Sequence, residues 1–227
     1  MFVTSKVIAA RQPGGGIIMA NENRRLIISI GREFGSGGHE IGEILAKRLN
    51  LPLYDANILA KIANKSDMEY EDIMKYDEKV VNLFLTRKVR GFSNSLEETI
   101  AELQFDYLRK KADAGESFVV VGRCSDEILK DYDGFISIFV YGIEEEKVKR
   151  TMNLYKISEA EAKIMNKKVD LKRRLYHNRY CENKWSDMHT YDMCIDSGIF
   201  GTEVAADLLE KAILQFQKDR PIKKVSE

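Results

Sequence analysis

The chain has 227 residues, which is enough for one α/β domain with a sizeable buried core and a mobile insert. Hydrophobic residues make up 44% of it and charged residues 32%, the balance of an ordinary globular protein. Lys+Arg and Asp+Glu both number 36, so the chain lacks the basic excess of proteins that coat a nucleic acid or an anionic membrane, and any anion site must be a local cluster.

Residues 1–25 are expected to form a flexible extension. The apolar run at 7–10 is interrupted at once by polar residues and a proline, so it is too short for a secretory signal. Three glycines at 14–16 indicate flexible chain, and Met19 is an alternative start of the protein. No stretch of the sequence approaches the ~18 apolar residues that a membrane helix needs.

A strand, a glycine-rich loop and a helix are predicted next. Residues 26–30 (LIISI) form an apolar, β-branched run, which is typical of a strand buried in a parallel sheet. Four glycines follow within 31–38, and apolar residues then recur at helical spacing over about 39–49. A second short strand, PLYD at 52–55, ends in an acidic residue.

The rest of the chain is predicted to be mostly helical up to residue 114 and then to alternate between strands and helices. Helices are predicted at 56–63, within 66–77, and over 78–114 with a break near 91–94. Further strands are predicted at 118–121, 135–141 and 193–195. Further helices are predicted just after residue 123, at 144–155, from the capping box of Ser158 and Glu161 towards residue 176, and at 202–217.

This alternation predicts an α/β fold with a parallel, doubly wound sheet of about five strands flanked by helices. One domain is expected over 26–217, followed by a charged, frayed tail at 218–227.

The glycine-rich stretch 31–40 (GREFGSGGHE) has the two properties that a phosphate-binding loop needs. Its glycines allow consecutive backbone N–H groups to turn towards an anion, and a helix start just beyond it attracts negative charge. Two alternatives remain open. A dinucleotide-binding fingerprint would require glycine where Glu40 stands, and a structural turn would need fewer glycines.

The usual phosphate loop ends in Gly-Lys-Ser/Thr, and this one does not. Gly38 stands where the lysine belongs, and His39 and Glu40 stand where a magnesium-binding hydroxyl would be. Another group must therefore supply the positive charge. Arg32 at the start of the loop and Arg123 at the end of a neighbouring strand are the candidates.

The run from Ile28 to Gly42 (ISIGREFGSGGHEIG) resembles the signature of the cytidylate kinase-like proteins, which are relatives of bacterial cytidylate kinase. Weaker motifs of that group recur in the same order: LYD at 53–55, VGRC at 121–124, an arginine- and tyrosine-rich stretch at 170–180, and YDMCI at 191–195. The resemblance covers about 26–217, which is nearly the whole chain.

This resemblance implies a P-loop NTPase fold of the nucleoside monophosphate kinase type. A helical insert at 57–114 would hold the acceptor nucleotide, and a lid at 158–185 would close over ATP. Relatives transfer the γ-phosphoryl group of ATP to CMP or dCMP with Mg²⁺. The implied ATP-binding residues are Gly35, Ser36, Gly37, Gly38, His39 and Glu40, with Glu40 also a candidate ligand of Mg²⁺.

The chain departs from true cytidylate kinases in several places. They keep the loop lysine and a following Thr, and they carry Asp-Gly-Arg-Asp where this chain has Val-Gly-Arg-Cys at 121–124. The Asp-x-x-Arg of the lid is retained as Asp170 and Arg173, but an arginine four residues earlier is Asn166 here.

Phosphoryl transfer depends on positioning and on positive charge around the moving group, so arginines are expected to carry it. The predicted catalytic residues are Arg32, Arg123, Arg173, Arg174 and Arg179. A solvated basic face is the alternative for the lid arginines, and a structural ion pair is the alternative for Arg123. Asp55, Asp170 and Arg123 are predicted to bind the acceptor, although Asp55 would also serve as a helix N-cap.

The resulting hypothesis is a cytoplasmic, ATP- and Mg²⁺-dependent kinase for a small acceptor such as a nucleoside monophosphate, with nucleotides as its partners. The alternatives are a nucleotide-binding regulator without catalysis, a kinase for another acceptor, and a nicotinamide-dependent enzyme. Both monomer and homodimer stay open. Cys124, Cys181 and Cys194 are widely spaced and odd in number, so neither a disulfide framework nor a zinc site is expected.

Overall fold

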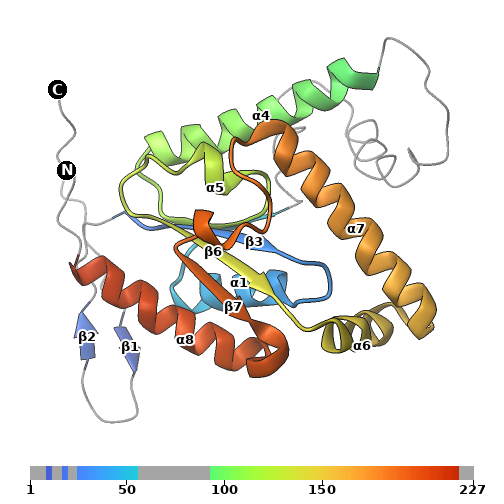
Figure 1. The fold of residues 1–227 in the computed structure, drawn as a ribbon. Coiled ribbons are helices and arrows are strands. Elements are labelled where there is room, and N and C mark those ends of the chain that lie inside the picture. Colours follow the sequence, from blue (N-terminus) through green and yellow to red (C-terminus); the bar gives the residue numbers. More distant parts are fainter. Residues whose placement is uncertain (1–8, 12–16, 20–24, 56–92, 220–227) are drawn as a thin grey trace.

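The computed structural model describes residues 9–11, 17–19, 25–55 and 93–219 (Figure 1). Its core is a five-stranded sheet in the order β4-β5-β3-β6-β7, in which all neighbouring strands are parallel. The strands are β3 (Ile27–Arg32), β4 (Leu53–Tyr54), β5 (Phe118–Val121), β6 (Phe135–Tyr141) and β7 (Met193–Asp196). The predicted α/β class with about five parallel strands is confirmed.

Helices cover both faces of the sheet, because the central strands are apolar on both sides. The helices are α1 (Gly38–Arg48), α4 (Ser93–Asp113), α5 (Ser125–Ile128), α6 (Glu144–Tyr155), α7 (Glu159–Tyr180) and α8 (Ser197–Asp219). Alternate residues of β3 serve the two layers. Ile28 and Ile30 pack with α1 and α8, whereas Ile27 packs with Leu108 of α4.

The polar residue inside β3 is also satisfied. Ser29 is almost fully buried, and its Oγ lies 2.7 Å from Oγ of Ser125 at the start of α5. This hydrogen bond ties the central strand to the short helix that follows β5. The central sheet therefore holds the ends of β3 and β5 in a fixed relation, which matters because both ends carry candidate site residues.

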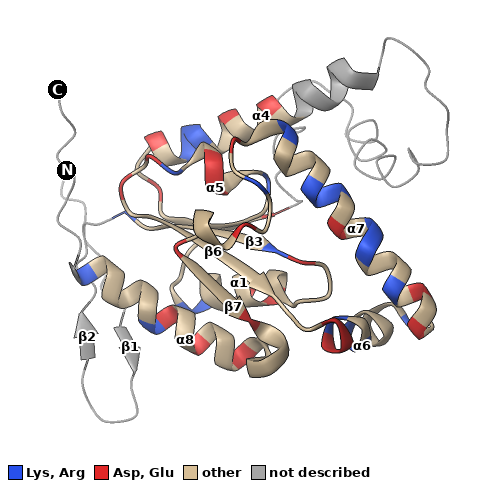
Figure 2. Ribbon diagram, in the orientation of Figure 1, with Lys and Arg blue, Asp and Glu red and all other residues tan. Residues whose placement is uncertain are grey.

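Helices α6 and α7 form a packed pair joined by a short turn, and α7 runs from α6 across to α4 (Figure 1). The predicted capping box at the start of α7 is present, with the Ser158 side chain accepting from the Glu161 N–H. Within the pair, Thr151 of α6 donates to Oδ1 of Asn166 in α7 at 2.8 Å, and both are buried. Figure 2 shows that basic residues recur along α7.

Some elements differ from the sequence-based expectation. Helix α7 extends to Tyr180, four residues beyond its predicted end. Within α8 the backbone at Gly201 (φ 71°) is not helical, so a short helical segment from Ser197, which was not predicted, precedes the helix expected at 202–217. Two short strands, β1 (Ala9–Arg11) and β2 (Ile17–Met19), pair antiparallel where no strand was predicted.

Helix α4 confirms a helix up to about residue 114 that begins near the predicted break. The helices predicted at 56–63 and 66–77, and the beginning of the one at 78–114, lie outside the described residues. The boundaries of the insert and of the lid stay predictions.

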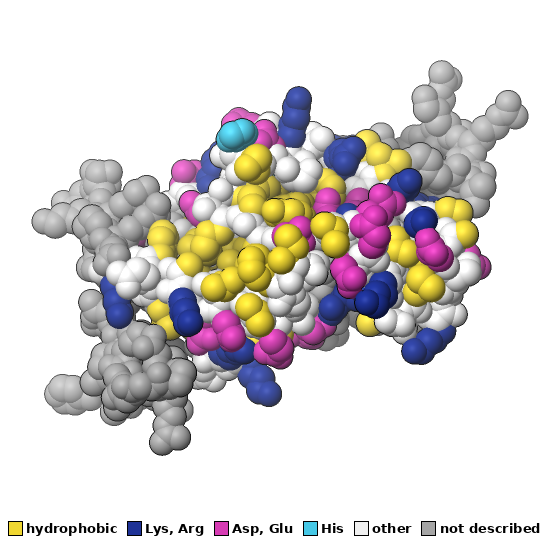
Figure 3. All heavy atoms as spheres, turned by 60° about the horizontal axis from the view of Figure 1, so that its bottom comes forward, with side chains coloured by type: hydrophobic (Ala, Val, Ile, Leu, Met, Phe, Trp, Pro, Cys, Tyr) yellow, Lys and Arg dark blue, Asp and Glu magenta, His cyan; other side chains and the backbone are white. Residues whose placement is uncertain are grey.

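None of the helices in the described part of the chain combines the length and apolar character of a membrane span. The outer face of α8 is nevertheless apolar, since Ile199, Phe200, Val204 and Leu208 are all exposed. Figure 3 shows hydrophobic side chains gathered on this face of the molecule.

Candidate functional site

The candidate site lies where β3 runs into the glycine loop at the carboxyl edge of the sheet, the edge at which open α/β folds bind ligands. The last residues of β3 stay in register with β6, and the Glu33 N–H donates to the Val140 carbonyl at 3.0 Å. Gly31 is required for this packing, because a Cβ there would lie 2.8 Å from the Phe139 ring. The loop therefore starts from a rigid strand end.

The loop itself turns so that several backbone N–H groups remain available. Gly35 and Gly37 both adopt φ of 78°, a left-handed conformation that favours glycine. Ser36 Oγ donates to the Glu33 carbonyl at 2.9 Å and accepts from the Gly38 N–H at 3.3 Å. Within the described residues, the N–H groups of Gly35, Ser36 and Gly37 have no hydrogen-bond acceptor.

Helix α1 begins directly after this turn, and no side chain caps it. Its first intrahelical bond runs from the Ile41 N–H to the Gly37 carbonyl at 3.0 Å, which leaves the preceding N–H groups pointing out of the helix start. Free N–H groups and the positive end of a helix dipole together favour an anion such as a phosphate. The local geometry thus agrees with the predicted phosphate loop.

The side chain of Arg32 occupies the space that the missing lysine would need. A Cβ on residue 38 would lie 2.5 Å from Cβ of Arg32, closer than real Cβ contacts come. At its far end the Arg32 guanidinium lies against Gly122, where any side chain would overlap it. The Arg32 side chain therefore packs along Gly38 and Gly122, and it fits there because neither residue has a side chain. A lysine at position 38 would overlap Arg32.

Three guanidinium groups gather around this loop. Burial lowers the pKa of Arg32 well below its ordinary value, and repulsion from Arg173 and Arg123 lowers it further, while Asp170 and Asp55 act in the opposite direction. Burial is also the main cause that lowers the pKa of Arg173. Positive groups that repel one another at a partly buried site are stabilised by a bound anion.

Helix α7 holds the start of the loop through two side chains. Oδ1 of Asp170 accepts from the Phe34 N–H at 2.6 Å, and Nη1 of Arg173 donates to the Arg32 carbonyl at 3.0 Å. The Arg173 guanidinium also lies 5.4 Å from the centre of the Phe34 ring. Burial raises the pKa of Asp170 to about 6, although the Phe34 N–H and Arg173 stabilise its carboxylate.

The other two lid arginines do not join this group. The exposed Arg174 lies over the ring of Trp185 at 5.8 Å, and the exposed Arg179 lies over Tyr180 at 5.7 Å. The predicted set of lid arginines is thus divided, with Arg173 at the loop and the other two on outer faces of α7. Their catalytic roles stay predictions.

His39 and Glu40, which follow the loop in sequence, bind partners on opposite sides of it. Nε2 of His39 lies 2.8 Å from Oδ2 of Asp55, which joins the first turn of α1 to the end of β4. Glu40 faces the opposite side, where Oε2 accepts from Arg150 and Oε1 accepts from Thr202 at 2.6 Å. Both carboxylate oxygens of the predicted magnesium ligand Glu40 therefore already have partners.

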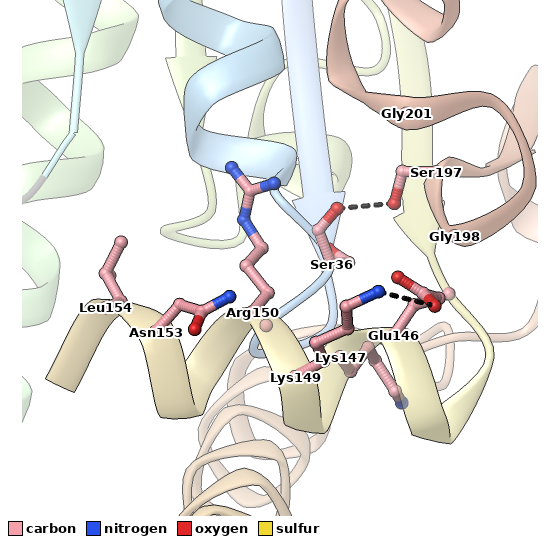
Figure 4. Close-up of a pocket in the computed structure, with 12 residues that line it drawn as sticks. Ser36, Glu146, Lys147, Lys149, Arg150, Asn153, Leu154, Ser197, Gly198 and Gly201 are labelled. Atoms are coloured by element: carbon pink, nitrogen blue, oxygen red, sulfur yellow. Dashed lines mark hydrogen bonds and ion pairs between the residues drawn. The ribbon is translucent and has the colours of Figure 1, made fainter. Parts of the chain in front are cut away.

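A pocket of about 370 Å³ lies on the α6 side of the loop (Figure 4). Ser197 lines the pocket, and its single O–H lies within hydrogen-bonding reach of two carbonyl oxygens, that of Ser36 and, at 2.9 Å, that of Tyr141. Its volume is at the lower end of the range for small-molecule sites. The lining includes Gly35, Ser36, Lys147, Arg150, Ser197 and Gly198.

Sequence reasoning missed the three basic residues that line this pocket, two of which, Lys147 and Arg150, contact the loop. Nζ of Lys147 lies 2.7 Å from Oε2 of Glu33, and Arg150 packs against Gly37 as well as binding Glu40. Their i, i+3 spacing on a helix that follows a buried strand was a usable signal, because it places both on one helix face.

Comparisons with known proteins found a matching family model and similar solved structures. The model of the cytidylate kinase-like family matches residues 27–199. The crystal structure of an uncharacterised protein from Eubacterium ventriosum is 38% identical with a TM-score of 0.65, and the match covers 86% of this chain and 100% of that one. No curated protein matches the chain.

Two more distant structures share the fold alone. Shikimate kinase from Acinetobacter baumannii, in complex with shikimate, is 15% identical with a TM-score of 0.51, covering 86% of this chain and 96% of that one. TT1252 from Thermus thermophilus is 16% identical with a TM-score of 0.52, covering 85% and 98%.

Proposed function

Since the chain belongs to the cytidylate kinase-like family, we propose that it transfers the γ-phosphoryl group of ATP to a small acceptor, and that this acceptor is a nucleoside monophosphate such as CMP or dCMP. The observation that carries the proposal is the group of Arg32, Arg123 and Arg173 around the uncapped start of α1. A phosphoryl group in transfer spreads negative charge over its oxygens, and positioned cations stabilise that charge.

In this proposal Arg32 performs the task of the absent loop lysine. The Arg32 side chain leaves the end of β3, passes next to Gly38 at the start of α1, and places its guanidinium next to Gly122. From there it would contact the β- and γ-phosphates, while the N–H groups of 35–37 bind the remaining phosphate oxygens. Burial and the neighbouring arginines lower the pKa of Arg32, and a bound phosphate would stabilise its charged form.

The two sides of the loop suit two substrates. The pocket beside Lys147, Arg150 and Ser197 would take the nucleoside part of ATP. The acceptor would approach from the side of Asp55 and Arg123, at the ends of β4 and β5, which adjoin the predicted helical insert. An acceptor placed there faces the γ-phosphate end of a bound ATP, which is the arrangement that direct transfer needs.

Few carboxylates near the loop are placed to bind Mg²⁺. Both oxygens of Glu40 are engaged by Arg150 and Thr202. Asp55 pairs with His39 through Oδ2 and lies on the side of the loop that faces Arg32. Magnesium in such enzymes is held by one or two carboxylates, with phosphate oxygens and water completing its shell. Asp55 is thus the side chain that would hold Mg²⁺, directly or through water, and the metal would neutralise phosphate charge.

A coupled ADP-release assay tests the proposal. The panel contains CMP, dCMP, the other nucleoside monophosphates and shikimate, each with ATP and Mg²⁺. We expect acceptor-dependent ADP release that falls by about 10²–10³ in R32A and R123A. R109A is the matched control, because Arg109 is exposed on α4 and pairs with nearby Asp106 at 3.4 Å. Equal turnover in R32A, R123A and R109A would contradict the proposal.

A second function is favoured by the replacement of the loop lysine with Gly38, namely a nucleotide-binding regulator without catalysis. Calorimetric titration with ATP separates the two. Tight ATP binding without ADP release from any acceptor would support the regulator. ADP release with shikimate or another non-nucleotide acceptor would support a kinase whose acceptor is not a nucleoside monophosphate.

A further inference from the structure

A compact group of metal-ligating side chains lies where the end of α7 meets the start of α5, outside the groups assigned to phosphoryl transfer. Cys124 precedes α5 and Asp126 lies in its first turn, while His177 lies in the last turn of α7 and Cys181 directly follows that helix. The four residues are Cys-x-Asp on one element and His-x-x-x-Cys on the other. Their sequence separation hides the group, which forms only in the fold.

The geometry of the group is specific. Nε2 of His177 lies 2.6 Å from Oδ2 of Asp126. The ligating atoms of Asp126, His177 and Cys181 lie within 4.8 Å of one another. Cys181 packs against the buried cluster that includes Cys124, and its thiol interacts electrostatically with the Cys124 thiol and the His177 ring, so the three groups lie near one another.

One nitrogen in this group is unused. His177 is only 5% exposed, and its Nδ1 is buried without a hydrogen-bond partner among the described residues. An ion pair with Asp126 explains Nε2, but it leaves the buried Nδ1 without a partner in a group that also contains a thiol. Metal-bound histidines in proteins usually donate their second ring N–H to a carboxylate, as His177 does to Asp126.

We propose that this group binds a thiophilic divalent cation such as Zn²⁺, with Sγ of Cys124, Sγ of Cys181 and Nδ1 of His177 as ligands and Asp126 orienting the imidazole. Two thiolates and an imidazole are ligands that zinc prefers, and a water would complete a tetrahedral shell. On binding, each thiol loses its proton to solvent, and Nδ1 binds as the unprotonated nitrogen of a neutral ring.

The proposed cation would fasten the end of α7 to the β5–α5 segment, one residue after Arg123. The same helix holds the glycine loop through Asp170 and Arg173. The cation would therefore hold Arg123, which precedes α5, and Arg173, which lies on α7, in a fixed position relative to each other. This site does not depend on the proposed kinase activity, and it would exist in a regulator with the same fold.

Titration of the reduced, metal-free full chain with Co²⁺ tests the proposal. We expect a thiolate-to-cobalt charge-transfer band in the near ultraviolet and strong visible bands of a tetrahedral site, both displaced by one equivalent of Zn²⁺. C194S is the matched control, since Cys194 is the exposed third cysteine, and it should leave the spectrum unchanged. C124S and C181S should each weaken the charge-transfer band, and D126N should weaken affinity about 10–100-fold.

Circular dichroism of each metal-free variant checks that a lost band reflects a lost ligand rather than an unfolded chain. The proposal is overturned if wild type shows no charge-transfer band, or if folded C181S keeps the full band. It is also overturned if the two thiols disappear from a free-thiol assay without metal, since that result would indicate a Cys124–Cys181 disulfide instead.

Discussion

Replacing Gly38 by alanine should lower the free energy of unfolding only when residue 32 carries a side chain that packs against it. In the structure a Cβ on residue 38 lies 2.5 Å from the Arg32 Cβ and 3.2 Å from the Val140 Cβ. The first contact requires movement of the strand end or of the start of α1. Overpacking of this kind typically costs about 1–3 kcal/mol, so G38A should lower the free energy of unfolding by that amount.

A double-mutant cycle isolates the contact. R32G removes the opposing Cβ, which R32A would keep, so R32G is the required partner. In the R32G background, G38A should cost no more than a few tenths of a kcal/mol, giving a coupling free energy of about 1–3 kcal/mol. Urea denaturation of wild type, G38A, R32G and R32G/G38A measures it. Equal costs of G38A in both backgrounds would refute the path assigned to Arg32.

The same pair of positions permits a functional exchange. R32G/G38K places a lysine where the usual phosphate loop has one and removes the side chain that blocks it. We expect R32G to lose about 10²–10³ in turnover and R32G/G38K to regain part of it. G38K alone should not exceed wild type, because Arg32 still occupies the space. A double variant no better than R32G would show that the two cations are not equivalent.

Three further predictions concern α7. R173A should lower turnover about 10²–10³-fold and R179A by less than tenfold in the coupled ADP assay, because Arg173 contacts the loop and Arg179 lies on an exposed face; equal losses would contradict this division. Turnover should fall as the pH drops through about 6, since Asp170 is ionised above that pH and holds the Phe34 N–H, and D170N should abolish this limb of the pH profile. S158A should lower the free energy of unfolding by about 0.5–2 kcal/mol by removing the α7 cap, and an unchanged denaturation midpoint would argue against the cap.

Much of the fold could be predicted because its signals are local. The runs at 118–121 and 135–141 are apolar on both faces, so they indicated strands inside a parallel sheet, and both strands have the predicted bounds. The capping box at Ser158 located the start of α7 correctly. The pairing of β1 with β2 was missed, because three-residue strands carry too little periodicity to be recognised.

The site was harder to predict because its geometry depends on long-range contacts. Arg32 was chosen from its place in the motif, but its path over Gly38 and Gly122 depends on strands that are far apart in the sequence. The engagement of Glu40 by Arg150 and Thr202 depends likewise on α6 and α8. No spacing rule contains such information, so sequence patterns located the loop but not the partners of its side chains.

A crystal structure with a non-hydrolysable ATP analogue would test the central claim most directly. The account predicts the β- and γ-phosphates against the N–H groups of residues 35–37, with the Arg32 guanidinium within hydrogen-bonding distance of a phosphate oxygen. Phosphates bound elsewhere, or an Arg32 side chain turned away from a correctly bound triphosphate, would contradict it.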